Sequence, residues 1–175
     1  MKARYVVDTN VLIAASAADP INPKDIDATP PDPALRLQVW EWLETFRASG
    51  SKMVLDTDNK IYDEYNNKLG FNDFGIQVVM YKWSTAAVDP VNVAYDSDGN
   101  GVLPASLVAV IHDLDDRKMV AAAIEAKRLH GEAPVAFAGD TDWHEWEDAL
   151  KQHGVELEPI IEAWSRAKFK AKNLR

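Results

Sequence analysis

Short runs of strand-forming apolar residues alternate along this chain with longer segments that carry apolar residues at helical spacing. Residues 4–7 form such a run, and the apolar segment 11–18 follows almost at once. Residues 53–55 and 135–138 repeat the arrangement, each leading into a segment with helical periodicity. Parallel strands need a crossover between them, which is usually a helix. The alternation therefore predicts an α/β protein, a three-layer α/β/α fold with a central parallel sheet.

Turn and capping residues set the other boundaries of the predicted elements. Segment 34–49 has helical spacing and stops at Gly50. We expect Thr57 or Asp58 to cap a helix that ends at Gly70. We expect Asp115 or Asp116 to cap a helix over 117–130. A last strand is expected at 155–157, followed by a terminal helix that begins at Pro159.

The 175 residues are expected to form a single domain, 1–175, because no repeat or linker divides the chain. Residues 19–33 are rich in proline and are expected to form an irregular loop insertion. Segment 71–104 is interpreted as an insertion or variable segment, in which residues 77–83 fit either a strand or a helix. Residues 163–175 are expected to form a basic C-terminal tail.

Composition narrows the environment of the protein. The chain has no cysteine, which excludes disulfides, thiolate zinc sites and cysteine nucleophiles. We find no membrane-spanning run and no signal peptide, so we expect a cytoplasmic protein without a membrane partner. The net charge is −9, and segment 163–175 carries five basic residues and no acid, which leaves −14 for the rest of the chain. The total charge argues against nucleic-acid binding, whereas the basic tail favours it.

Four carboxylates lie where the elements of such a sheet begin or end. Asp8 follows the first strand, and Asp140 follows the strand 135–138 across Gly139. Asp116 begins a helix, and Glu64 lies in the helix after the second strand. An Asp after a strand or at a helix start is commonly a cap, so each of these carboxylates alone is more typical of a structural role. Together at one rim they would repel one another without a cation. Their hard oxygen atoms suit Mg²⁺ or Mn²⁺ and metal-assisted phosphodiester hydrolysis.

Four segments in order along the chain resemble the motifs of PIN-domain nucleases. They cover nearly the whole sequence, and we identify them as Val6-Val7-Asp8-Thr9-Asn10-Val11-Leu12, Ile61-Tyr62-Asp63-Glu64-Tyr65, the segment from Asp113 to Ala123, and Ala138-Gly139-Asp140-Thr141-Asp142-Trp143. The resemblance implies a PIN-like fold and a nuclease that requires Mg²⁺ or Mn²⁺, with RNA the expected substrate rather than DNA. The metal ligands it implies are Asp8, Glu64, Asp116 and Asp140, with Asp142 as an additional ligand.

The same resemblance implies further roles and partners. Thr9 and Asn10 would shape the site as second-shell or substrate-contacting residues. Many small relatives are VapC-like toxins, which dimerise and are neutralised by an antitoxin protein, so a homodimer and an antitoxin are expected partners. A stand-alone processing or defence nuclease is the enzymatic alternative, and a PIN scaffold that binds or assembles with weak or no cleavage is the other. Asp63 replaces Glu64 as the ligand if the helix register is shifted by one, and Gly139 stands where a hydroxyl-bearing residue or Asn is common.

Other polar and aromatic residues receive less specific interpretations. Residues 96–101 imitate the first half of a calcium-binding loop, but Leu107 stands where a bidentate Glu is needed, so a plain turn is favoured over a partial calcium site. The histidines lack metal-ligand spacing, and most tryptophans are expected in the core. Trp143 or Trp146 remains a candidate for lining a substrate groove.

Overall fold

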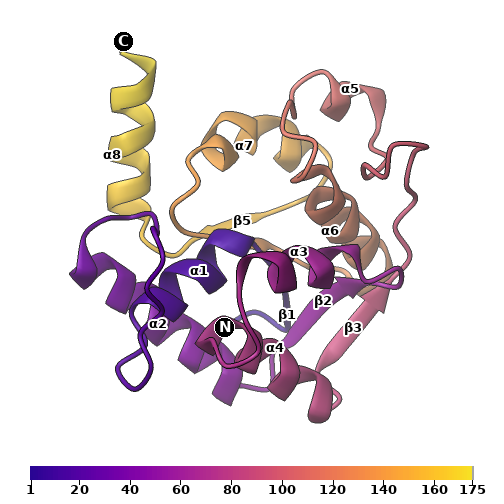
Figure 1. Cartoon of the computed structure of the whole chain (residues 1–175). Coiled ribbons are helices and arrows are strands. Elements are labelled where there is room, and N and C mark those ends of the chain that lie inside the picture. The colour runs from indigo at the N-terminus through magenta and orange to yellow at the C-terminus, as the bar shows by residue number, and fades with distance from the viewer. Residues whose placement is uncertain (175) are drawn as a thin grey trace.

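Five parallel strands form one sheet at the centre of the computed structural model, which describes residues 1–174 (Figure 1). Their order in the sheet is β3-β2-β1-β4-β5. The strands are β1 (Arg4–Val7), β2 (Lys52–Asp56), β3 (Val88–Val91), β4 (Val135–Phe137) and β5 (Leu157–Pro159). Every neighbouring pair is parallel, which confirms the predicted α/β class.

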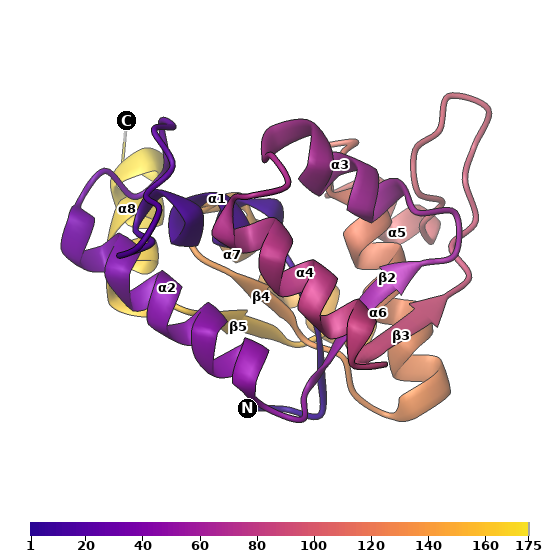
Figure 2. The same cartoon turned by 60° about the horizontal axis from the view of Figure 1, so that its bottom comes forward.

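Helices cover both faces of the sheet, so the predicted three layers are present. One layer contains α1 (Thr9–Ala17), α2 (Pro33–Ala48) and α4 (Phe74–Ser84), which pack against one another (Figure 2). On the other face, α6 (Arg117–His130) packs across β1, β2, β3 and β4. The remaining helices are α3 (Lys60–Lys68), α5 (Ala105–Val108), α7 (Asp142–Gln152) and α8 (Glu162–Asn173).

The order of the strands creates a topological switch beside β1. The chain moves from β1 outward through β2 to β3, and then crosses back to place β4 on the other side of β1. In open parallel sheets, ligands bind at the carboxyl ends of the strands at such a switch. Asp8 and Asp140 follow the two strands that flank this point.

Segment 71–104 contributes to the sheet and to a covering layer. Its residues 74–84 form helix α4, which resolves the ambiguity over 77–83 in favour of a helix. Strand β3 is not apparent in the sequence because it is short and contains Pro90. A proline is tolerated there because β3 lies at the edge of the sheet, with only β2 as a neighbour.

Three predicted element boundaries are wrong, and one of them is that of the last strand, which covers Leu157–Pro159 instead of residues 155–157. The carboxylate of Asp56, not Thr57 or Asp58, receives the first amides of α3, with distances of 3.0 Å from Lys60 N and 2.8 Å from Ile61 N. Pro159 ends β5 instead of opening the terminal helix, which begins at Glu162. Because β5 is also an edge strand, its proline removes no hydrogen bond between strands on the open side.

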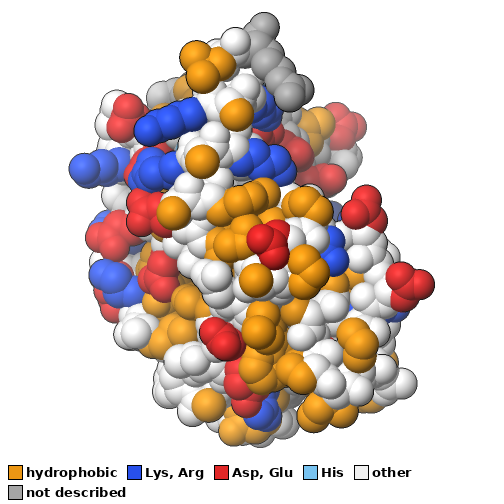
Figure 3. Space-filling view, turned by 90° about the vertical axis from the view of Figure 1, so that its left-hand side faces the viewer, with side chains coloured by type: hydrophobic (Ala, Val, Ile, Leu, Met, Phe, Trp, Pro, Cys, Tyr) orange, Lys and Arg blue, Asp and Glu red, His pale blue; other side chains and the backbone are white. Residues whose placement is uncertain are grey.

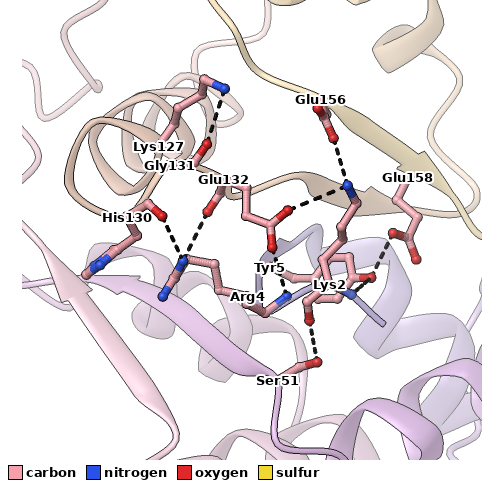
Figure 4. A network of polar contacts seen from close by, with 11 residues as sticks. Lys2, Arg4, Tyr5, Ser51, Lys127, His130, Gly131, Glu132, Glu156 and Glu158 are labelled. Carbon is pink, nitrogen blue, oxygen red and sulfur yellow. Dashed lines mark hydrogen bonds and ion pairs between the residues drawn. The ribbon is translucent and has the colours of Figure 1, made fainter.

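A polar network ties together the amino ends of the strands, on the edge of the sheet opposite Asp8 (Figure 4). The buried Tyr5 hydroxyl donates to Glu158 at 2.7 Å, and the Lys2 ammonium lies 3.3 Å from Glu156. The Ser51 hydroxyl donates to the carbonyl of Lys2 at 2.6 Å. The polar side chains at this edge therefore link the strands to one another and have a structural role.

The basic C-terminal segment is largely helix α8, and residue 175 lies outside the described part of the chain. Lysine and arginine side chains surround α8 in the space-filling view, and hydrophobic side chains gather on the face next to it (Figure 3). Among residues 1–174, no helix has both the length and the apolar content needed to cross a bilayer.

Candidate metal centre

Asp8 is a buried carboxylate without a full set of partners. It directly follows β1 and occupies the N-cap position of α1, but its side chain makes no capping hydrogen bond. Only 2% of the residue is exposed, and Oδ2 has no hydrogen-bond partner. Burial raises the pKa of Asp8 well above its usual range, and the charges of Asp140 and Glu64 raise it further, against an opposing effect of the Asn10 amides. A buried, unpaired carboxylate oxygen of this kind suits a cation.

Glu64 faces the same site from helix α3. The Thr9 hydroxyl, one residue after Asp8, donates to Glu64 Oε1. The Lys118 ammonium, from the first turn of α6, lies 2.5 Å from Glu64 Oε2. Asp63 is exposed, so the tertiary structure selects Glu64 over its neighbour as the carboxylate of this site.

Asp116 joins the site from the start of α6. It is the N-cap residue, yet its side chain makes no capping hydrogen bond, and only 8% of the residue is exposed. Burial raises the pKa of Asp116 to about 9, and the negative charges of Asp8 and Asp140 add to this effect. Asp113 and Glu64 contribute in the same direction. These mutual effects place Asp8, Glu64, Asp116 and Asp140 in one electrostatic unit, the acid cluster.

Asp140 and Asp142 behave differently from each other. Asp140 Oδ1 accepts the backbone amide of Asp142 at 2.9 Å, which helps to begin α7. Burial raises the pKa of Asp140, and the charges of Asp142 and Asp113 add to the increase. The carboxylate of Asp142 pairs with Lys172 of α8 at 2.5 Å. The structure thus groups Asp140 with the acid cluster and directs Asp142 toward the basic helix.

Asp113 is an acidic residue near the site to which the sequence pattern gives no role. It lies in the exposed turn before α6, and its charge raises the pKa values of both Asp116 and Asp140. The available signal was its position at the start of the third motif, three residues before Asp116.

The proline-rich loop explains the glycine in the fourth motif. A Cβ atom at Gly139 would lie 2.3 Å from the carbonyl oxygen of Thr29 and 2.9 Å from its methyl carbon. A side chain at position 139 would therefore collide with the backbone of segment 19–33. The loop packs directly against the strand end that carries Asp140, and a residue larger than glycine is sterically excluded at position 139.

The composition of the acid cluster fits a divalent cation, although its geometry is not that of a closed metal site. Across residues 1–174, no three acidic or histidine side chains form a ready-made group for a metal ion. All four members offer carboxylate oxygens, the donors that Mg²⁺ and Mn²⁺ favour, and these ions keep several water ligands. The unpaired Asp8 Oδ2 is the observation most directly suited to such an ion.

The other candidate features have structural roles. In the turn 96–101, Asp96 Oδ1 accepts the amides of Asp98 and Asn100 at 3.0 and 2.9 Å, so this carboxylate closes a turn. Trp143 and Trp146 are both buried and pack edge-to-face at 5.4 Å, so neither lines a surface groove. Trp83, expected in the core, is 42% exposed on α4.

Comparisons of the chain with models of known protein families, with curated proteins and with solved structures find no match.

Proposed function

We propose that this chain is a Mg²⁺- or Mn²⁺-dependent nuclease that hydrolyses phosphodiester bonds, with RNA as its substrate. The observation that carries the proposal is the acid cluster at the topological switch, in which Asp8 is buried with an unpaired oxygen. Two of its members, Asp8 and Asp116, have strongly raised pKa values, because burial and, in addition, the charges of nearby carboxylates disfavour their ionisation. Such a concentration of negative charge is unfavourable without a cation and is characteristic of functional sites.

Each residue would have a definite task in the reaction. Asp8, Glu64, Asp116 and Asp140 would hold the metal, and Asp142 would assist from the start of α7. The Thr9 hydroxyl orients Glu64 through its hydrogen bond, and the Asn10 amides lower the pKa of Asp8 and so favour the ionised form that a metal ion requires. When bound, the metal ion supplies charge stabilisation at the phosphate and lowers the pKa of an attacking water. The carboxylates would keep the ion and the scissile phosphate in fixed relative positions.

One contact favours the alternative of a binding or assembly scaffold with weak or no cleavage. The ion pair between Lys118 and Glu64 already neutralises one member of the acid cluster without a metal ion. A scaffold of this kind would retain the fold and the ion pair while its affinity for divalent cations is low. Direct measurement of Mn²⁺ binding by calorimetry therefore separates the two functions.

The test of the nuclease is an assay of single-stranded RNA cleavage with added Mn²⁺. The wild type is compared with Asp8→Asn and Asp116→Asn, and with Asp148→Asn as the matched control. Asp148 is an exposed carboxylate on α7, outside the acid cluster. We expect wild type and Asp148→Asn to cleave and the other two to lose activity together with Mn²⁺ binding. Equal cleavage by all four proteins would refute the assigned site, and a wild type without cleavage or Mn²⁺ binding would favour the scaffold.

The biological setting is a further part of the proposal. The absence of cysteine is compatible with the reducing cytoplasm, which we propose as the compartment. A toxin with an antitoxin partner and a homodimer, or alternatively a stand-alone processing or defence nuclease, remain predictions from the motif resemblance.

A further inference from the structure

A cavity of about 460 Å³ opens beside the acid cluster, between α3, the turn 96–101 and the start of α6. We call it the lysine groove, because Lys60, Lys68 and Lys118 line it together with Asn67 and Gly99. Glu64 belongs both to this lining and to the acid cluster, so the groove is continuous with the candidate metal centre. All of its lining side chains are charged or polar, which favours a charged or strongly polar ligand.

Two of the three lysines in the groove have no acidic partner. Among residues 1–174, most lysines and arginines form ion pairs or donate to carbonyl oxygens, but Lys60 and Lys68 do neither. The Lys60 ammonium lies 4.8 Å from the centre of the Tyr95 ring, which holds it at the groove. In a chain of net charge −9, unpaired cations that line a cavity are available to contact an anion.

Lys118 connects the groove to the acid cluster. Its ammonium pairs with Glu64 Oε2 at 2.5 Å and donates to the carbonyl of Asp115 at 2.7 Å. A cation bound at Glu64 would neutralise this carboxylate and leave Lys118 available for an anion in the groove. The close approach of Gly101 to the backbone of Lys118, where a Cβ would lie only 2.7 Å away, keeps the turn 96–101 packed against this lysine.

We propose that the lysine groove binds the phosphates of a single nucleic-acid strand, next to the position where the acid cluster acts. The catalytic meaning of this site depends on the proposed nuclease function, but its binding does not. Lys60 and Lys68 are eight residues apart on α3, about 12 Å along the helix axis. With its bases stacked as in B-form DNA, a strand rises about 3.4 Å per nucleotide, so this distance corresponds to at most about three to four nucleotides. The groove is therefore long enough for more than one phosphate.

The chemistry of the groove also predicts what it does not distinguish. Lysine ammonium groups contact phosphate as point charges and carry no information about bases or sugars. Asp63 and Asp115, which are also part of the lining, reduce the positive potential. We therefore expect weak binding that depends on salt and is lost equally for RNA and DNA when the lysines are removed.

The experiment measures fluorescence anisotropy of labelled oligouridylate and of oligothymidylate of the same length, in EDTA to prevent cleavage. Lys68→Ala and the double variant Lys60→Ala/Lys68→Ala are compared with wild type. Lys151→Ala is the matched control, because Lys151 is also exposed, lies in the last turn of a helix and has no acidic partner among residues 1–174. Circular dichroism checks that all variants retain the fold.

The expected loss follows from counterion release. Each phosphate contact to a single strand adds about 0.7 to the slope of log affinity against log salt concentration. Between 1 M and 50 mM salt, such a slope corresponds to a gain of about eightfold in affinity. We expect Lys68→Ala to weaken binding about eightfold and the double variant about sixtyfold, with a correspondingly smaller salt dependence. Lys151→Ala should bind like the wild type.

Three results would overturn the proposal: a wild type that binds neither oligonucleotide at low salt, groove variants that bind as tightly as Lys151→Ala, or a loss confined to RNA. This outcome is independent of the nuclease assay. If the wild type cleaves RNA and the groove variants bind the oligonucleotides as tightly as the wild type, only the proposed role of the groove is refuted. A protein that binds through the groove without cleaving refutes only the nuclease.

Discussion

Replacing Asp116 with asparagine should stabilise the metal-free protein, although it removes a proposed metal ligand. Asp116 is buried, and its pKa is raised to about 9, mainly by burial and by the charges of Asp8 and Asp140. Its side chain makes no capping hydrogen bond that the substitution would remove. Asparagine has nearly the same shape and remains uncharged at every pH, so the repulsion within the acid cluster decreases.

The sign and size of the effect follow from linkage between protonation and folding. The folded-state pKa of Asp116 lies above its ordinary value of 3.8, so its stabilising contribution is complete below that pH and is lost as the pH rises toward 9. At about 1.36 kcal/mol per pH unit, the contribution lost by pH 7 is about 4 kcal/mol. This value is a ceiling, because structural relaxation and water entry lower the cost of ionisation. We expect a gain of about 1–3 kcal/mol for Asp116→Asn at pH 7.

The assay is urea denaturation in EDTA at about pH 5, 7 and 9. Wild type, Asp116→Asn and Asp148→Asn are compared, the last as an exposed acid on α7 outside the acid cluster. The free energy of unfolding of Asp116→Asn should exceed that of wild type increasingly from pH 5 to pH 9. Asp148→Asn should follow the wild type. Added Mn²⁺ should reverse the order, because a ligand that binds only the folded state stabilises it and Asp116→Asn would bind the ion poorly.

Parallel pH profiles for wild type and Asp116→Asn, or a lower stability of the variant at pH 7, would refute the reasoning. Either result would mean that the carboxylate ionises without strain in the metal-free site. The carboxylates of the acid cluster would then not repel one another strongly, and this repulsion is the reason for inferring a cation site.

Two further predictions concern positions outside the acidic ligands. Gly139→Ser should lower the free energy of unfolding in urea by about 1–3 kcal/mol, because its Cβ would overlap the Thr29 carbonyl oxygen; a neutral effect would contradict this packing. Burial lowers the pKa of Lys82 to about 8, so its charged form destabilises the fold at lower pH and its contribution to stability grows from about pH 8 to 10.5. The unfolding free energy of wild type relative to Lys82→Met should therefore rise by up to about 3 kcal/mol over that interval, and a constant difference would disprove the shift.

The positions of the acidic residues were predictable from the sequence to different degrees. Asp8, Asp116 and Asp140 stand directly at element boundaries, which the hydrophobic pattern reveals. The choice between Asp63 and Glu64 depends on the rotation of α3 against its neighbours, and the contacts of Glu64 with Thr9 and Lys118 decide it. No local sequence pattern predicts the rotation of α3 against its neighbours.

The sequence alone determined the alternation of strands and helices, and hence the parallel three-layer fold, because periodicity and chain-reversing residues are local properties. The sequence does not reveal strand β3, because its four residues, including Pro90, show no strand pattern. Its hydrogen bonds depend on pairing with β2, which only the tertiary structure places beside it. Only the tertiary structure decided that Gly139 meets Thr29 and that the lysine groove adjoins the acid cluster. It also set the raised pKa of Asp116, since burial and the charges of neighbouring carboxylates arise from segments distant in the chain.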